Sequence, residues 1–232
     1  MTNMDKLYEA VAARGPVCVG LDTDFSYLPA DFVDTALTKG ENIVRFNKKL
    51  IDATKAVAGC YKVQIAYYES LGLEGMKAYA ETLAAVREAG IPVIADIKRG
   101  DIAKTAEMYA MGHFTGDFES DFVTLAPYMG LDSISPYLPY AEKQGKGMFV
   151  LCRTSNGGAK DFEYEKLADW QPGQEYQLKI DSLGIKGIYA YGSTDLSADS
   201  GRTDFGRMGR ACRAGGRQEL CKCICYGEKK RR

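Results

Sequence analysis

Short apolar runs alternate with longer amphipathic stretches along most of this 232-residue chain. Apolar runs of this length, bounded by Gly, Pro and polar residues, are typical of buried strands, and the stretches between them carry apolar residues at helical spacing. Strands that alternate with helices form βαβ units, whose strands lie parallel in one sheet. The pattern therefore predicts an α/β fold with a parallel sheet. The strands are expected at residues 16–21, 60–66, 91–97, 121–126 and 147–152, and a sixth is expected to begin at residues 187–190.

The helices expected between these strands have unequal lengths. A polar helix begins within residues 1–15, and a long helical pattern covers residues 31–58 with an interruption at Gly40. Eight β/α units close a TIM barrel of about 250 residues. We therefore predict a TIM (β/α)8-type barrel that is apparently incomplete, with about six units recognisable in residues 1–190. Shorter helices are expected at residues 75–90, 103–112, 132–145 and 174–183.

The last part of the chain differs in composition. Residues 201–232 hold ten Lys or Arg, three acidic residues and four Cys, with almost no apolar periodicity, so they can bury little surface. We expect residues 191–232 to form a basic, Cys-rich tail, and our hypothesis is that the reading frame changes near Tyr191. The spacing of these Cys residues is not the usual C-x2-C of zinc sites, so no metal is expected there.

The overall composition argues against two classes of partner. Hydrophobic residues make up 46% of the chain and the net charge is -1, which is typical of neither nucleic-acid-binding nor membrane proteins. We find no signal peptide and no apolar run of about 18 residues, and we expect a cytoplasmic protein with no specific nucleic-acid partner.

Cys18, Cys60 and Cys152 are predicted to be buried thiols. His113, the only histidine, is predicted to lie on the surface.

The third predicted strand ends in charged residues instead of an ordinary turn. Residues two apart in a strand share a face, so Asp96 and Lys98 point the same way, and Gly100 lets the chain turn before Asp101. A cation is thereby expected between two carboxylates. The carboxyl ends of barrel strands are where such folds place catalytic groups. By itself, a D-x-K-x-x-D pattern is also typical of a salt-bridged loop.

The neighbouring residues narrow this interpretation. The string Asp96-Ile97-Lys98-Arg99-Gly100-Asp101-Ile102-Ala103-Lys104-Thr105 resembles the signature of the orotidine 5'-phosphate decarboxylase family. Cys18-Val19-Gly20-Leu21-Asp22, Tyr61-Lys62-Val63-Gln64 and Arg153-Thr154-Ser155-Asn156 resemble its bacterial branch with larger subunits. The resemblance runs from about Leu7 to about Tyr189. It implies that orotidine 5'-monophosphate loses carbon dioxide to give uridine 5'-monophosphate, the last step of de novo UMP synthesis, without a metal or organic cofactor.

The resemblance also implies roles for individual residues. Lys98 would stabilise the charge that develops on the pyrimidine and then donate a proton, while Asp96 and Asp101 hold it in position. Asp101 would reach the active site of a neighbouring subunit, which implies a homodimer. The substrate contacts implied by the match are Asp22 and Lys62 toward the ribose, Ile102 and Thr105 from the partner subunit, and Ser155 toward the pyrimidine amide. Gln64 is expected beside the ribose contacts.

Two alternatives stay open at this point. The family carries a Gly-rich phosphate loop and a phosphate-binding Arg late in the barrel, and we find neither, so the chain could be an impaired or inactive barrel remnant. The family also has a proline after the position of Asn156, where this chain has Gly157 and Gly158. Metal-dependent sugar-phosphate synthases and decarboxylases share the D-x-K-x-x-D pattern on similar barrels. Ile102, Thr105 and the Ser155 string favour the nucleotide enzyme.

Overall fold

The computed structural model describes residues 1–161 and 188–192. Within them, six parallel strands form one sheet in the order β1-β2-β3-β4-β5-β6. The five predicted strands and the start of a sixth are thereby confirmed. The strands are β1 Val17–Gly20, β2 Ala58–Gln64, β3 Val93–Arg99, β4 Phe122–Leu125, β5 Gly147–Arg153 and β6 Ile188–Gly192.

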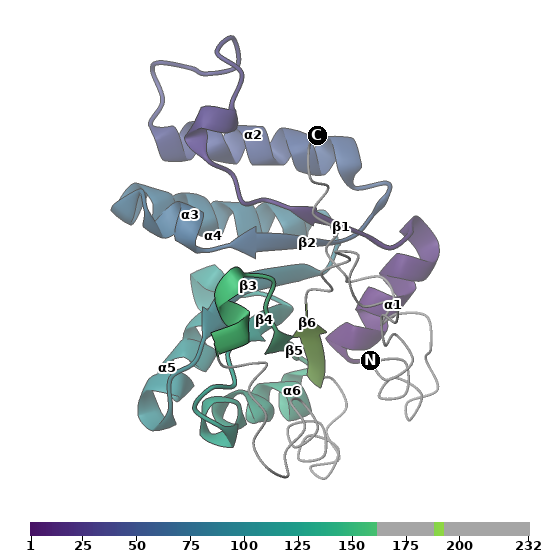
Figure 1. The fold of residues 1–232 in the computed structure, drawn as a ribbon. Coiled ribbons are helices and arrows are strands. Elements are labelled where there is room, and N and C mark those ends of the chain that lie inside the picture. The colour runs from purple at the N-terminus through teal and green to yellow at the C-terminus, as the bar shows by residue number, and fades with distance from the viewer. Residues whose placement is uncertain (162–187, 193–232) are drawn as a thin grey trace.

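Helices follow the strands along the outer side of the curved sheet (Figure 1). One helix, α1, instead lies across the end of the sheet at which the strands begin, where Met4 and Leu7 pack against Cys60 of β2. The α-helices are α1 Asn3–Arg14, α2 Lys39–Thr54, α3 Ala66–Glu69, α4 Gly72–Glu88, α5 Ala103–Phe114 and α6 Leu138–Gln144. Short 3-10 helices are η1 Phe25–Tyr27, η2 Gly116–Phe118, η3 Leu131–Ser133, η4 Ser135–Tyr137 and η5 Gly157–Asp161.

The two faces of the sheet bury different clusters, because successive strand residues point to opposite sides. On the outer face, Tyr61, Val63, Val93 and Ala95 join the large core formed with the helices. On the inner face, Cys60, Ile94, Phe122 and Phe149 form a smaller cluster with α1. We call this smaller cluster the barrel floor. It fills the inner face near the beginnings of the strands. Other residues occupy the inner face at the carboxyl ends of the strands.

The helix predicted over residues 31–58 begins later and ends earlier than expected. Thr38 and Glu41 form a capping box that starts α2 at Lys39, as this residue pair favours, and the chain is already in β2 at Ala58. Gly40 lies inside α2 instead of interrupting it. A Cβ at Gly40 would lie 2.8 Å from the Glu74 carbonyl oxygen of α4, so glycine permits the close approach of the two helices.

The helix predicted over residues 132–145 is also broken into parts. The segment forms η3, η4 and then α6, which begins only at Leu138. Pro136 and Pro139 lie at the starts of η4 and α6. Because proline has no N–H and cannot sit in a helix interior, it starts new helical segments here.

Two predictions about burial are wrong. His113 is only 5% exposed, because α5 turns Ala106, Ala110, His113 and Phe114 inward at helical spacing. Cys60 is buried as predicted, but Cys18 is partly exposed and Cys152 is exposed, since it lies near the carboxyl end of β5. Among the helices that the structure describes, none has the length and apolar character needed to cross a bilayer.

Candidate active site

Polar residues occupy the inner face directly above the barrel floor. Two residues beyond Cys60 comes Lys62, two beyond Ile94 comes Asp96, and two beyond Phe122 comes Thr124. In a strand this spacing returns a side chain to the same face. The parallel register sets Gln64 of β2 beside Asp96 of β3. The sheet therefore gathers these polar groups at the carboxyl ends of β2, β3 and β4.

Asp96 is the centre of this group and is 5% exposed. Its carboxylate accepts hydrogen bonds from Lys98 Nζ at 2.7 and 2.9 Å, Lys62 Nζ at 3.1 Å, Gln64 Nε2 at 3.1 Å and Thr124 Oγ1 at 2.8 Å. Burial raises the pKa of the Asp96 carboxyl, but the Lys62 cation and the hydrogen bonds from Lys98 and Thr124 lower it more, so the pKa lies below its ordinary value. Asp96 is therefore an anion at neutral pH.

Lys62 links Asp96 to a second carboxylate. Its Nζ lies 3.0 Å from both carboxylate oxygens of Asp22, which follows β1. Asp22, Lys62, Asp96 and Lys98 thus form a row of alternating charges across three strands. We call these four residues the charge row. The side chain of Lys62 is nearly buried between its partners, whereas that of Lys98 is 44% exposed, so the row presents an ammonium group to solvent at one end.

Asp101 does not join the charge row in this chain. Its carboxylate accepts a hydrogen bond from the backbone N–H of Ile102 at 2.8 Å, and within residues 1–161 no ion pair connects it to Lys98. Ile102 and Thr105, at the start of α5, are both exposed. The structure therefore brings Asp96 to Lys98, as expected, but leaves the partly buried Asp101 apart from the charge row and Ile102 and Thr105 exposed.

The remaining predicted residues are less closely grouped. Gln64 belongs to the cluster through its bond to Asp96, whereas Ser155 is exposed in the loop after β5. The tail of residues 191–232 and its Cys residues lie outside the described residues, apart from the end of β6. The late part of the barrel, where the family carries its phosphate loop, also lies outside the described residues.

Sequence reasoning overlooked Thr124. It is a buried polar residue in an apolar strand, and its hydroxyl bonds both to Asp96 and to the backbone of β3. The strand pattern contained the necessary signal, because Thr124 lies two residues after Phe122 and so faces the barrel interior.

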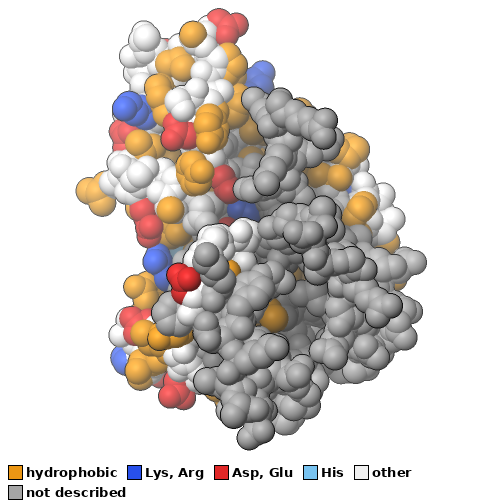
Figure 2. Space-filling view, viewed as in Figure 1, with side chains coloured by type: hydrophobic (Ala, Val, Ile, Leu, Met, Phe, Trp, Pro, Cys, Tyr) orange, Lys and Arg blue, Asp and Glu red, His pale blue; other side chains and the backbone are white. Residues whose placement is uncertain are grey.

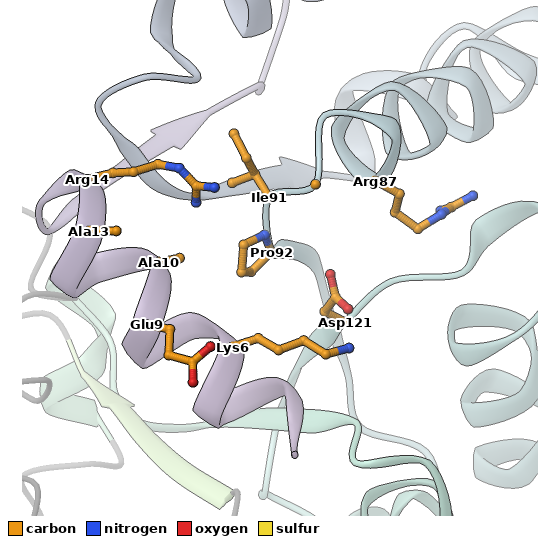
Figure 3. Close-up of a pocket in the computed structure, with 10 residues that line it drawn as sticks. Lys6, Glu9, Ala10, Ala13, Arg14, Arg87, Ile91, Pro92 and Asp121 are labelled. Atoms are coloured by element: carbon orange, nitrogen blue, oxygen red, sulfur yellow. The ribbon is translucent and has the colours of Figure 1, made fainter.

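One cavity lies along β1 and another lies near the start of β3. The first, of about 470 Å³, adjoins the charge row and is lined by Cys18, Gly20, Asp22 and Thr23 together with Tyr27, Phe46 and Leu50. The second, of about 540 Å³, lies between α1 and the start of β3 (Figure 3). Lys6 and Asp121 point into that second cavity. Lys6 already donates a hydrogen bond to Asn3, and Asp121 already accepts one from the backbone N–H of Val93. Of these two cavities, the first includes a residue of the charge row, Asp22, and the second includes none.

Comparison with known proteins gives a consistent result. The family described as "Orotidine 5'-phosphate decarboxylase / HUMPS family" matches residues 15–206. Among curated relatives, orotidine 5'-phosphate decarboxylase of Clostridium perfringens strain SM101 is 52% identical over 202 residues, covering 86% of this chain and 70% of the relative. The enzyme of the same name from strain 13 is 61% identical over 202 residues, with the same coverage of both chains.

Solved structures agree with these sequence relatives. Leishmania donovani OMP decarboxylase matches with a TM-score of 0.66 and 36% identity, covering 81% of this chain and 70% of the other. A putative orotidine 5'-phosphate decarboxylase from Streptomyces avermitilis matches with a TM-score of 0.72 and 29% identity, covering 84% and 70%. The predicted TIM-type barrel is thereby confirmed as the fold class.

Proposed function

The chain belongs to the orotidine 5'-phosphate decarboxylase / HUMPS family, and from this we propose that it converts orotidine 5'-monophosphate to uridine 5'-monophosphate and carbon dioxide. The observation that carries the proposal is the charge row, in which the buried Asp96 holds the ammonium groups of Lys62 and Lys98. This row ends in an exposed cation at the end of the sheet where such barrels bind substrates.

The reaction needs a cation and an acid at one position. When the substrate carboxylate leaves as carbon dioxide, the bonding electron pair stays on the pyrimidine carbon and makes it carbanion-like. In the proposed mechanism the Lys98 ammonium stabilises that developing charge and then transfers a proton to the same carbon. The neutral amine regains its proton from water. These steps balance without a metal or an organic cofactor.

Asp96 keeps Lys98 suited to both tasks. The two bonds of 2.7 and 2.9 Å from Lys98 Nζ to the Asp96 carboxylate fix the position of the ammonium group. An ammonium group has three N–H donors, so one remains for the substrate after two point toward Asp96. Asp22, Lys62 and Gln64 are proposed to contact the ribose, since Asp22 lines the cavity beside the row, and Ser155 is proposed to contact the pyrimidine amide.

We further propose that the active site is completed by a second copy of the chain. Asp101, Ile102 and Thr105 would act in the partner's site, because within residues 1–161 Asp101 forms no ion pair with Lys98 of its own chain and because Ile102 and Thr105 are exposed. Exposed apolar side chains continue along the same helix at Met108 and Met111, and such patches often mark interfaces. The resulting homodimer would share Asp101 across its interface.

The proposed cellular setting is the cytoplasm, and no specific nucleic-acid partner is proposed. The basis for this proposal is the family to which the chain belongs, a family of biosynthetic enzymes. Lys, Arg, Asp and Glu side chains are interspersed on the described part of the face in Figure 2. Such mixing does not favour binding to a polyanion.

The deciding experiment is decarboxylation of orotidine 5'-monophosphate by the purified 232-residue chain, followed by ultraviolet absorbance with EDTA present. We expect turnover that Lys98→Ala lowers by at least about 10³-fold, because both a general acid and a fixed cation are lost. Lys77→Ala removes an exposed lysine of α4 and should leave turnover unchanged. Dependence on magnesium would support a sugar-phosphate enzyme instead, and no turnover from folded protein would identify an inactive barrel.

A further inference from the structure

The pairing of β3 with β4 changes register next to the charge row. Ala95 pairs with Val123, but the next pair joins Arg99 to Leu125. Four steps along β3 therefore match two along β4, which is a bulge in β3. Bulged residues lose their regular backbone partners, and a buried N–H without a partner is costly. The bulge contains Ile97 and Lys98.

A side chain of β4 replaces the missing backbone partners. The backbone N–H groups of Ile97 and Lys98 donate to Thr124 Oγ1 at 3.0 and 2.9 Å. Lys98 has a φ of 44°, a left-handed conformation that non-glycine residues adopt only where their surroundings enforce it. The Thr124 hydroxyl thus holds a strained backbone position, and that position belongs to the lysine at the exposed end of the charge row.

The same hydroxyl also fixes the carboxylate that holds the lysine side chain. Thr124 Oγ1 donates to Asp96 Oδ1 at 2.8 Å, and Asp96 Oδ1 accepts from Lys98 Nζ. A hydroxyl has one donor and two acceptor positions, and all three are used. Because Thr124 is 4% exposed, little water is available to replace these bonds.

We propose that Thr124 is a positioning residue that sets where the Lys98 ammonium lies, by holding both the backbone of Lys98 and the carboxylate of Asp96. It does not touch the substrate. The expected effect of Thr124 on turnover rests on the function proposed above. Its expected effect on the backbone of Ile97 and Lys98 does not. Misplacing a reacting group by about 1 Å can lower the rate by 10²-fold. Loss of the Thr124 hydroxyl should therefore lower kcat.

The kinetic test compares Thr124→Val with Thr124→Ser. Valine keeps the branched shape and removes the hydroxyl, and serine keeps the hydroxyl. We expect Thr124→Val to lower kcat by about 10- to 100-fold with little change in KM, because Asp22 and Lys62 keep their mutual contact, and Thr124→Ser to recover most of the rate. The matched control is Thr82→Val, which removes a buried hydroxyl bonded to Asn47 away from the charge row and should leave kcat unchanged.

A second measurement is independent of turnover. Hydrogen exchange of the Ile97 and Lys98 amides, followed by NMR, should be slow in the wild-type chain and in Thr124→Ser, and faster in Thr124→Val while the other amides of β3 stay protected. If valine prevents folding, Thr124→Ala provides the same comparison with serine. Wild-type kcat in the hydroxyl-free variant, or unchanged protection of both amides, would overturn the inference. An inactive wild type with the expected exchange pattern would refute the proposed function and keep the positioning role.

Discussion

The ammonium group of Lys62 lies 3.1 Å from the carboxylate of Asp96, although 34 positions separate the two residues in the chain. The contact crosses from β2 to β3, and each partner is almost removed from solvent. Lys62 is also the main influence that lowers the pKa of Asp96 against the effect of burial. This pair therefore links the stability of the barrel to the ionisation of the proposed active site.

Lys62→Met should destabilise the fold by roughly 3 kcal/mol at pH 7, because it removes the cation that joins Asp22 to the buried Asp96 and leaves Asp96 with Lys98 as its remaining ionic partner. In the wild type the pKa of Asp96 is below the unfolded value of about 3.9, so its contribution is present above that pH and lost below it. In the variant the pKa of Asp96 has lost its main lowering influence and is therefore higher than in the wild type. The deficit should therefore shrink as the pH falls toward 4.

Urea unfolding of both proteins between pH 4 and pH 8 measures this difference. Lys77→Met, which removes an exposed lysine, provides the control and should match the wild type throughout. A Lys62→Met deficit that does not change with pH would contradict the coupling to Asp96.

Complementation between two inactive variants tests the shared site. If the proposed homodimer forms, a dimer of Lys98→Ala with Asp101→Ala has one active site that combines Lys98 of one chain with Asp101 of the other, and both are intact. Random mixing gives half heterodimers, so about a quarter of all sites should recover activity. The measurement is turnover after the two proteins are dissociated and reassociated together. Activity no higher than the sum of the separate variants would show that each chain uses its own Asp101.

His113 should make the fold sensitive to moderate acid. Burial, together with the Arg99 cation, lowers the pKa of His113 to about 4, whereas an unfolded histidine titrates near about 6.5. Between these values only the unfolded chain binds the proton, so stability present above pH 6.5 is lost as the pH falls toward 4. The expected loss is roughly 3 kcal/mol.

The test is the free energy of unfolding of the wild type and His113→Phe at pH 7.5, 6, 5 and 4. As the pH falls, the free energy of unfolding of the wild type should decrease relative to that of His113→Phe. Parallel pH profiles would show that His113 titrates normally in the folded protein.

Gly147→Ala should disturb the barrel floor. A Cβ at Gly147 would collide with the Phe122 ring, which is fully buried, and overpacking of this kind costs about 1–3 kcal/mol. Gly112→Ala in α5 is the matched change without a collision, because nothing lies within 4 Å of its Cβ position, and alanine should stabilise the helix by up to about 1 kcal/mol. Thermal unfolding of both variants measures the contrast, and equal shifts would contradict it.

Much of the barrel could be predicted because strand alternation has a strict period. The period of two places Lys62 above Cys60 and Asp96 above Ile94, so the polar end of the barrel follows from the sequence. The bulge in β3 could not be foreseen, because it depends on a hydroxyl of another strand that replaces backbone partners. Burial of His113 was missed because it depends on how α5 is rotated against the sheet. The break before α6 follows from Pro136 and Pro139, which a purely apolar pattern ignores.

The barrel floor and the charge row occupy successive levels of the same strands. Two residues of strand separate them, or about 6.6 Å, and each inner-facing position belongs to one level only. Replacing the upper level therefore changes which molecule the barrel can transform, while the apolar level below it continues to hold the strands together. In evolutionary terms, substitutions at a few alternate strand positions can give such a barrel a new reaction while its fold stays the same.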